Sequence, residues 1–157
     1  MSDFRRPQVP TRLLVVVVLV VAAGFAAIGA TARASSPTTT IGSRHTKAGT
    51  ILVGPRGQTL YLFSHGPNGP SGCYGRCARN WPPLRASGRP VATPGSGVKQ
   101  AWLSTTRRRD GIVQVTYDGF PLYVDRGHTE PGDLAGAHAH EFGGRWYVVP
   151  ICGVKRT

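Results

Sequence analysis

Short apolar runs separated by Gly- and Pro-rich turns dominate the chain after residue 48. Within these runs, successive side chains alternate between two faces, as expected for β-strands. Turn sequences at 54–57 and at Asp118 and Gly119 join four of the runs into two hairpins. The predicted strands are 50–53, 59–63, 112–117, 120–124 and 145–150.

One segment departs from the strand pattern. Residues 73–81 fit one or two helical turns, which the following Pro82 and Pro83 would end. Gly and Pro are abundant along the body of the chain, and this disfavours longer helices. We therefore expect an all-β or β-rich α+β fold with one short helical segment.

The two predicted hairpins are related in sequence. Segment 57–63 recurs as 119–125, and in both copies a turn glycine stands three positions ahead of a Leu-Tyr pair. Such self-similarity indicates two diverged β-hairpin repeats in one small domain. The predicted boundaries are a domain at 49–151 and a tail at 152–157, with repeat one at 49–85, a connecting loop at 86–110 and repeat two at 111–151.

The N-terminal region has the features of an export signal. Arginines precede an unbroken apolar run at 13–30, and Ala32 and Ala34 offer a cleavage site. As a helix, the run would measure roughly 27 Å, close to the roughly 30 Å of a bilayer core. Residues 1–34 are therefore predicted to be a signal peptide or a signal anchor.

Both outcomes place the body of the protein outside the cytoplasm, either secreted or held at the cytoplasmic membrane by residues 13–30. No cysteine stands at the end of the export segment, so we expect no lipid anchor of the bacterial lipoprotein kind. Residues 35–48 are rich in Ser and Thr and lack apolar periodicity, so we expect a flexible linker there.

The chain is strongly basic, with 19 Lys and Arg against 7 Asp and Glu and a formal net charge of +12. Possible partners of such an exported protein are acidic envelope polymers or a membrane surface, whereas export disfavours nucleic acid. The densest cluster, Arg107, Arg108 and Arg109, is the candidate anion patch. The alternative is that the arginines are scattered over a solvated surface.

The cysteines are Cys73, Cys77 and Cys152. In an oxidising compartment we expect Cys73 and Cys77 to pair with each other or with Cys152. Loop entropy favours the long bridge, at about 4–5 kcal/mol against about 2 kcal/mol for the local one. Positions i and i+4 of a helical turn, however, face the same way. Metal binding or a reactive thiol is a further alternative, and an unpaired Cys152 would be available to form a dimer.

Histidines provide the candidate metal ligands. His138 and His140 lie on one side of an extended segment, at a spacing that can chelate copper or zinc, with His128 as a possible third ligand. A closed site needs three or four ligands. Solvated loop histidines without a cofactor are therefore the simpler expectation.

The sequence contains no nucleophile elbow, no phosphate-cradling glycine loop and no zincin motif. We therefore expect no enzymatic activity. The leading hypothesis is an exported, envelope-associated, non-catalytic binding or structural module. The alternatives are a metal or redox accessory protein that uses His138 and His140, and a basic adhesin for acidic envelope polymers.

A series of ordered motifs resembles a known family. The matching elements include Cys73-x-x-x-Cys77, Trp81-Pro-Pro-Leu, the strand 114–117, Pro131-Gly-Asp and Trp146-Tyr-Val-Val. They resemble the bacterial secreted-repeat proteins, described as predicted lipoproteins with a Tyr-x-aromatic-x-x-Asp motif. The resemblance covers nearly the whole body, implies no characterised activity, and supports the local disulfide.

The chain departs from the family motif at the aspartates. Gly66 stands in the aspartate position of the first copy, and in the second copy Asp125 replaces the aromatic residue and His128 the aspartate. The role that these aspartates have in relatives must therefore be performed differently here, if at all. The family positions carried over are Tyr61, Phe63, Tyr123 and Asp133.

Overall fold

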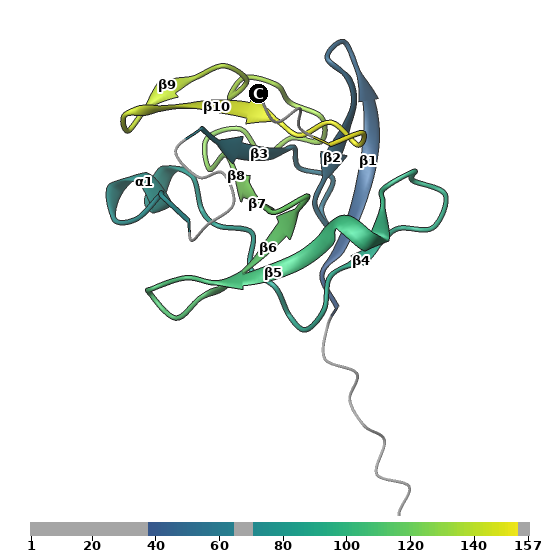
Figure 1. Cartoon of the computed structure of the whole chain (residues 1–157). Helices are drawn as coiled ribbons and strands as arrows, with labels where there is room; N and C mark the ends of the chain where they lie inside the picture. Colours follow the sequence, from purple (N-terminus) through teal and green to yellow (C-terminus); the bar gives the residue numbers. More distant parts are fainter. Residues whose placement is uncertain (1–37, 65–70, 154–157) are drawn as a thin grey trace, which may run out of the picture. The chain divides into compact units, whose positions relative to one another are not determined.

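The computed structural model describes residues 38–64 and 71–153. Their elements surround two hydrophobic clusters (Figure 1). The strands are β1 (Thr40–Thr46), β2 (Gly49–Val53), β3 (Leu60–Phe63), β4 (Val91–Ala92), β5 (Leu103–Arg107), β6 (Val113–Tyr117), β7 (Phe120–Pro121), β8 (Tyr123–Val124), β9 (His140–Glu141) and β10 (Gly144–Val148). The helices are α1 (Arg76–Asn80) and the 3-10 turn η1 (Gln100–Trp102).

The described strands form three sheets, with the orders β2-β1-β4, β8-β3-β10-β9 and β5-β6-β7. The helix α1 lies within the segment 73–81 for which a helical turn was expected. The prediction of a β-rich fold with one short helical segment is therefore confirmed. The predicted export signal at 1–34 lies outside the described residues, among which no helix is long and apolar enough to cross a membrane.

Strand β3 is buried on both faces, because its alternating side chains enter different hydrophobic clusters. Leu60 and Leu62 pack into one cluster, and Tyr61 and Phe63 pack into the other. All four side chains are at most 5% exposed. Burial of a large apolar side chain contributes about 1.5–3 kcal/mol, so this short strand holds the two clusters together.

Equivalent strands of the two repeats lie side by side. Strands β3 and β8 pair antiparallel, with Tyr61 opposite Tyr123, its own counterpart in the second repeat. Trp81 and Trp146 stack nearly parallel with ring centroids 4.0 Å apart. A residue that meets its own counterpart across an antiparallel pair lies next to a two-fold axis. The repeats are thus related by an internal two-fold axis near these aromatic pairs.

Each repeat is completed by a segment of the other repeat. Segment 80–86 bonds to the second hairpin, and segment 145–151 bonds to the first. The backbone hydrogen bonds match in three pairs, the first in each pair involving 145–151. The N–H of Leu52 donates to the Val149 carbonyl (2.7 Å), as that of Val115 donates to Leu84 (2.8 Å). The N–H of Ile151 donates to Thr50 (3.2 Å), as that of Ala86 donates to Val113 (2.9 Å), and Ser64 donates to Arg145 (2.9 Å), as Arg126 donates to Asn80 (3.0 Å). We call 80–86 and 145–151 the closing segments.

The expectation of a flexible linker at 35–48 is wrong where the structure forms β1. This strand pairs antiparallel with β2 from Gly42 opposite Val53 to Thr46 opposite Gly49. Its first residues pair with β4, and Ile41 is fully buried. Thr is a favourable strand residue when it lies on a half-buried surface. Because β1 pairs with β2 as β5 pairs with β6, each repeat begins with a strand that the sequence analysis did not assign to it.

The second hairpin turns as its sequence predicts. Asp118 and Gly119 have φ values of 51° and 82°, as a two-residue turn with two left-handed positions requires. Pro121 lies in β7, at the edge of its sheet, where no partner needs a backbone N–H from it.

Candidate functional site

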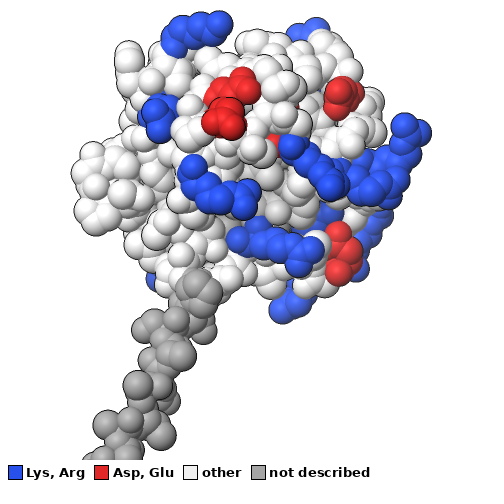
Figure 2. Space-filling view, turned by 180° about the vertical axis from the view of Figure 1, so that it is seen from behind, with Lys and Arg blue, Asp and Glu red and all other residues white. Residues whose placement is uncertain are grey.

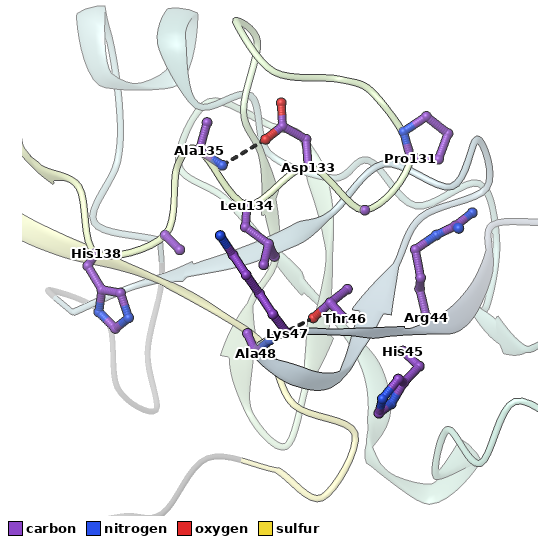
Figure 3. A pocket seen from close by; sticks show the side chains of 12 residues that line it. Arg44, His45, Thr46, Lys47, Ala48, Pro131, Asp133, Leu134, Ala135 and His138 are labelled. Atoms are coloured by element: carbon purple, nitrogen blue, oxygen red, sulfur yellow. Dashed lines mark hydrogen bonds between the residues drawn. The ribbon is translucent and has the colours of Figure 1, made fainter.

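A hollow of about 960 Å³ lies where the turn of the β1–β2 hairpin meets the loop 131–138 (Figure 3). In Figure 3, Lys47 extends from the hairpin toward Leu134 and Ala135, whereas Arg44 lies on the side of Pro131. The residues that line this first hollow are Arg44, His45, Thr46, Lys47, Ala48, Pro131, Gly132, Asp133, Leu134, Ala135, Ala137 and His138.

Local hydrogen bonds fix the hairpin side of the first hollow. The hydroxyl of Thr46 donates to the carbonyl of Gly49 at 2.9 Å and accepts the N–H of Ala48 at 3.1 Å. Gly49 has a φ of 91°, which a residue with a side chain rarely adopts. Lys47 is therefore held at the tip of a defined turn, and it is exposed there.

Hydrogen bonds also fix the loop 131–138 on the other side of the first hollow. The Asp133 carboxylate accepts the N–H of Ala135 at 2.8 Å, and the Tyr61 hydroxyl donates to the Asp133 carbonyl at 3.2 Å. Burial is the main cause that raises the pKa of Tyr61 to about 12, so this hydroxyl keeps its proton at neutral pH. Arg44 crosses Gly132, where a Cβ would lie 2.5 Å from the arginine Cδ.

Basic groups outnumber acidic ones in the lining of the first hollow. Arg44 and Lys47 are exposed cations, His45 and His138 are exposed imidazoles, and Asp133 is the one carboxylate of the lining. The ion pairs found between described residues involve other side chains. Guanidinium and ammonium groups donate hydrogen bonds and accept none. With two exposed cations against one carboxylate, the first hollow favours an anionic ligand.

The predicted anion patch needs a correction, because Arg108 is buried. The residue as a whole is 2% exposed. Its guanidinium donates hydrogen bonds to Asp110 at 2.9 Å, to Gln114 at 3.1 Å, to the Cys73 carbonyl at 2.7 Å and to the Ser71 hydroxyl. The hydrogen bond from Arg108 is the main cause that lowers the pKa of Asp110. The Arg108 guanidinium thus joins the end of β5 to the disulfide loop and is not accessible to a partner.

The neighbouring arginines remain on the surface. The guanidinium of Arg109 lies 3.9 Å above the ring of Tyr74, and Arg107 donates to a carbonyl of its own hairpin turn at 3.2 Å. Helix α1, which follows Tyr74, adds the exposed Arg76 and Arg79. In Figure 2, lysine and arginine side chains form a band that is densest on the right, the side of α1, and few acidic side chains interrupt it.

The candidate metal ligands are not brought together. His138 lines the first hollow, His128 lines a second hollow beside Asp125, and His140 lines a third with Arg145. Within 38–64 and 71–153, no three His, Cys, Asp or Glu side chains are placed to hold a metal ion. Chelation of copper or zinc by His138 and His140 stays a prediction.

The cysteines behave as the local alternative predicts. Cys73 and Cys77 form a disulfide with Cα atoms 5.2 Å apart, so the alternative bridge to Cys152 is wrong. Cys152 is a free, exposed thiol. Whether it links two chains stays a prediction.

The aromatic family positions belong to the core. Trp146 stacks on Phe63 at 4.5 Å and meets Tyr123 edge-on at 5.2 Å, and Tyr61 meets Trp81 edge-on at 5.2 Å. These rings are at most 5% exposed and pack with the disulfide in one cluster. They stabilise the junction of the repeats and offer no stacking surface to a ligand. Asp133, the fourth family position, lies instead in the wall of the first hollow.

A second hollow, of about 390 Å³, has acidic groups that are already engaged. The Trp81 indole N–H donates to Glu141 at 2.8 Å. Asp125 is 9% exposed, accepts the N–H of Gly127 at 2.8 Å and lies 3.0 Å from His128. Because these carboxylates have partners inside the protein, the second hollow is the weaker candidate for binding.

The sequence analysis missed Arg44 and Lys47, because it assigned them to a linker. A signal was present in the repeat: His45 and Lys47 occupy the positions in the first copy that Arg107 and Arg109 occupy in the second. Extending the repeat comparison toward the N-terminus would have placed both basic clusters on hairpin ends.

Comparison with known proteins agrees with the internal repeat. No curated protein and no solved structure matches the chain. The family described as a secreted repeat of unknown function matches residues 42–85 and 104–150, more than half of the chain. The two matched segments begin at Gly42 in β1 and Ser104 in β5, which are equivalent positions of the two repeats. The chain therefore belongs to this family of secreted repeats, which agrees with a place outside the cytoplasm.

Proposed function

We propose that the protein is an exported, non-catalytic binding module that holds an acidic polymer of the cell envelope at the first hollow. The observation that carries this proposal is the basic lining in which Arg44 and Lys47 face a concave surface without an ion-pair partner among the described residues. Several phosphate or carboxylate groups spaced along one polymer would satisfy cations on both sides of the hollow. Attraction between many weakly paired charges gives affinity without deep burial.

The polar groups of the lining support binding rather than catalysis. The Thr46 hydroxyl is engaged in the hairpin turn, and the Asp133 carboxylate accepts a hydrogen bond within its own loop. A hydroxyl nucleophile is commonly activated by an adjacent general base. Neither group is arranged in this way.

The surface favours a polymer over a bilayer. The large hydrophobic side chains exposed in the described part of the chain are Val91 and Phe142. Stable attachment to a membrane interface requires a larger apolar face. A concave, basic hollow without such a face fits a chain-like ligand better than a flat lipid surface.

The test compares two charge-matched double variants of the full chain. Arg44→Gln/Lys47→Gln removes two cations from the first hollow, and Arg89→Gln/Arg145→Gln removes two exposed cations elsewhere. Binding to long-chain polyphosphate, to poly-glutamate and to anionic phospholipid vesicles is measured at increasing salt. At about 1 kcal/mol per cation, the hollow variant should lose roughly tenfold or more in affinity for the polymers.

The control variant should stay within about threefold of the unmodified protein, and all polymer affinities should fall as salt screens the charges. Equal losses in both variants would show that only total charge matters, and the proposal would fail. Preference for vesicles over both polymers would also contradict it. Comparison of polyphosphate with poly-glutamate separates phosphate from carboxylate ligands.

A further inference from the structure

The two hairpin ends are structurally equivalent and both are basic. These are the ends of the β1–β2 and β5–β6 hairpins. His45 lies opposite Thr50 in the β1–β2 hairpin, and Arg107 lies opposite Val113 in the β5–β6 hairpin. Thr50 and Val113 are themselves equivalent, because each carbonyl accepts a backbone N–H from a closing segment. The next basic position, Lys47 in the first repeat, corresponds to Arg109 in the second.

The loops that face the hairpin ends are equivalent as well. The N–H of Cys77 donates to the Tyr74 carbonyl at 3.1 Å, and the N–H of Ala139 donates to the Gly136 carbonyl at 3.3 Å. The two loops share this hydrogen-bonded turn but then diverge, because Arg76 begins the helix α1 whereas His138 has a φ of 65°.

The paired tyrosines extend this equivalence. Tyr123 reaches the loop 71–77 through its hydroxyl at Ser71, and Tyr61 reaches the loop 133–139 at Asp133. In this alignment the exposed Arg76 of α1 is the counterpart of His138, and it follows closely on Tyr74, above whose ring the Arg109 guanidinium lies at 3.9 Å.

A substitution between the repeats distinguishes the two ends. Thr46 in the first repeat corresponds to Arg108 in the second, whose buried guanidinium fills the space beneath the disulfide loop. The first end is therefore an open hollow, whereas the second is a filled surface. On that filled surface Arg76, Arg107 and Arg109 are exposed.

We propose that this filled surface is a second anion-binding site, so that one molecule binds two segments of acidic polymer and bridges them. The inference rests on the proposed function and adds a second binding site for the same kind of ligand. Asp110, the acidic residue of this end, is paired with the buried Arg108 at 2.9 Å. It therefore offsets the charge of the buried arginine, and the exposed arginines remain available for phosphate or carboxylate groups.

The first experiment counts sites with a short probe. Tripolyphosphate is titrated calorimetrically into the full chain at low salt. The unmodified protein should bind two equivalents, and Arg44→Gln/Lys47→Gln should bind one. Arg76→Gln/Arg109→Gln should also bind one, with affinity at the altered end reduced about tenfold or more. Arg76→Gln/Arg79→Gln serves as a second variant of α1 that leaves the contact between Arg109 and Tyr74 intact.

The second experiment measures bridging of long-chain polyphosphate by light scattering. Arg44→Gln/Lys47→Gln and the two α1-side variants, Arg76→Gln/Arg109→Gln and Arg76→Gln/Arg79→Gln, should each bind the polymer but form far fewer cross-linked particles. The charge-matched Arg89→Gln/Arg145→Gln variant should bridge as well as the unmodified protein. All proteins carry Cys152→Ser, because the exposed thiol could otherwise link two chains and imitate a second site.

The outcomes separate the two proposals. A single equivalent in the unmodified protein, or undiminished bridging by both α1-side variants, overturns the second site while the first hollow stands. Loss of all tripolyphosphate binding in Arg44→Gln/Lys47→Gln also overturns the second site and leaves the first hollow as the one site. Absence of binding by the unmodified protein overturns the proposed function and the second site together.

Discussion

Neighbouring arginines of one sequence cluster have different roles. Arg107 and Arg109 are exposed, whereas Arg108 is buried with hydrogen-bond acceptors on every nitrogen. Burial of a charge is tolerated only where the fold supplies partners. Two of the acceptors, Ser71 and the Cys73 carbonyl, come from the disulfide loop, which is more than 30 residues away from Arg108 in sequence. The sequence therefore identified the cluster but could not show which arginine turns inward.

Replacing Arg108 should destabilise the protein without a direct effect on binding. In Arg108→Gln, several buried acceptors lose their donor, and we expect the free energy of unfolding to fall by about 2–4 kcal/mol. Arg107→Gln, an exposed neighbour, should change it by less than about 0.5 kcal/mol. Urea denaturation of both variants checks this. Equal stability of the two variants would mean that the buried network contributes nothing.

Tyr61 should make the protein sensitive to alkali. Its pKa is raised to about 12 in the folded state, first by burial and then by the Asp125 carboxylate. The unfolded tyrosine ionises near pH 10, so the unfolded state releases its proton first. Stability from this group is therefore present below about pH 10 and is lost as the pH rises toward about 12.

The measurement is the alkaline unfolding midpoint of Tyr61→Phe against the unmodified protein. The variant keeps the buried ring but has no proton to lose, so its midpoint should lie at higher pH. An unchanged or lower midpoint would show that the phenol does not contribute to alkaline unfolding.

At the scale of elements, the predictable strands are those with continuous or alternating apolar positions. β3 and β6 fall within predicted strands, β2 begins one residue before its predicted strand, and the turn between β6 and β7 follows from its Asp-Gly pair. β1 was missed because its exposed positions are mainly Ser, Thr and basic residues, which also form linkers. Ile41 is its one strongly apolar position, and the segment forms a strand through pairing with β2 and, at Thr40 and Ile41, with β4.

Ile41 provides a test of β1 as part of the core. A fully buried isoleucine shortened to alanine should lower the free energy of unfolding by about 2–4 kcal/mol. Val91→Ala in β4, where the side chain is 42% exposed, is the control and should have a small effect. Denaturant titration compares them. If Ile41→Ala were neutral, β1 would behave as the linker that was first expected.

At the scale of the whole folded body, the closing segments join the repeats into one unit. Segment 80–86 bonds to the second hairpin and 145–151 to the first. The strand pattern predicted two hairpins but could not predict this exchange, because it depends on contacts between residues far apart in sequence. The same limit hid the first hollow, which forms only when the β1–β2 turn meets the loop 131–138.

The exchange predicts that the two halves need each other. Fragments 38–97 and 98–157 each contain one hairpin and the closing segment of the other. Separately they should lack cooperative unfolding, whereas together they should form a folded one-to-one complex. Circular dichroism with analytical ultracentrifugation measures both properties. Cooperative folding of either fragment alone would show that its hairpin does not require the other half.

The central claim is that basic hairpin ends bind acidic polymer. Its most direct measurement is a nuclear magnetic resonance titration of the isotope-labelled protein with polyphosphate, which reports every backbone amide at once. We predict shifts concentrated at 44–48 and 131–138, with a second group at 74–79 and 107–111. Shifts centred on the acidic second hollow around Asp125, or an unchanged spectrum at low salt, would contradict the account.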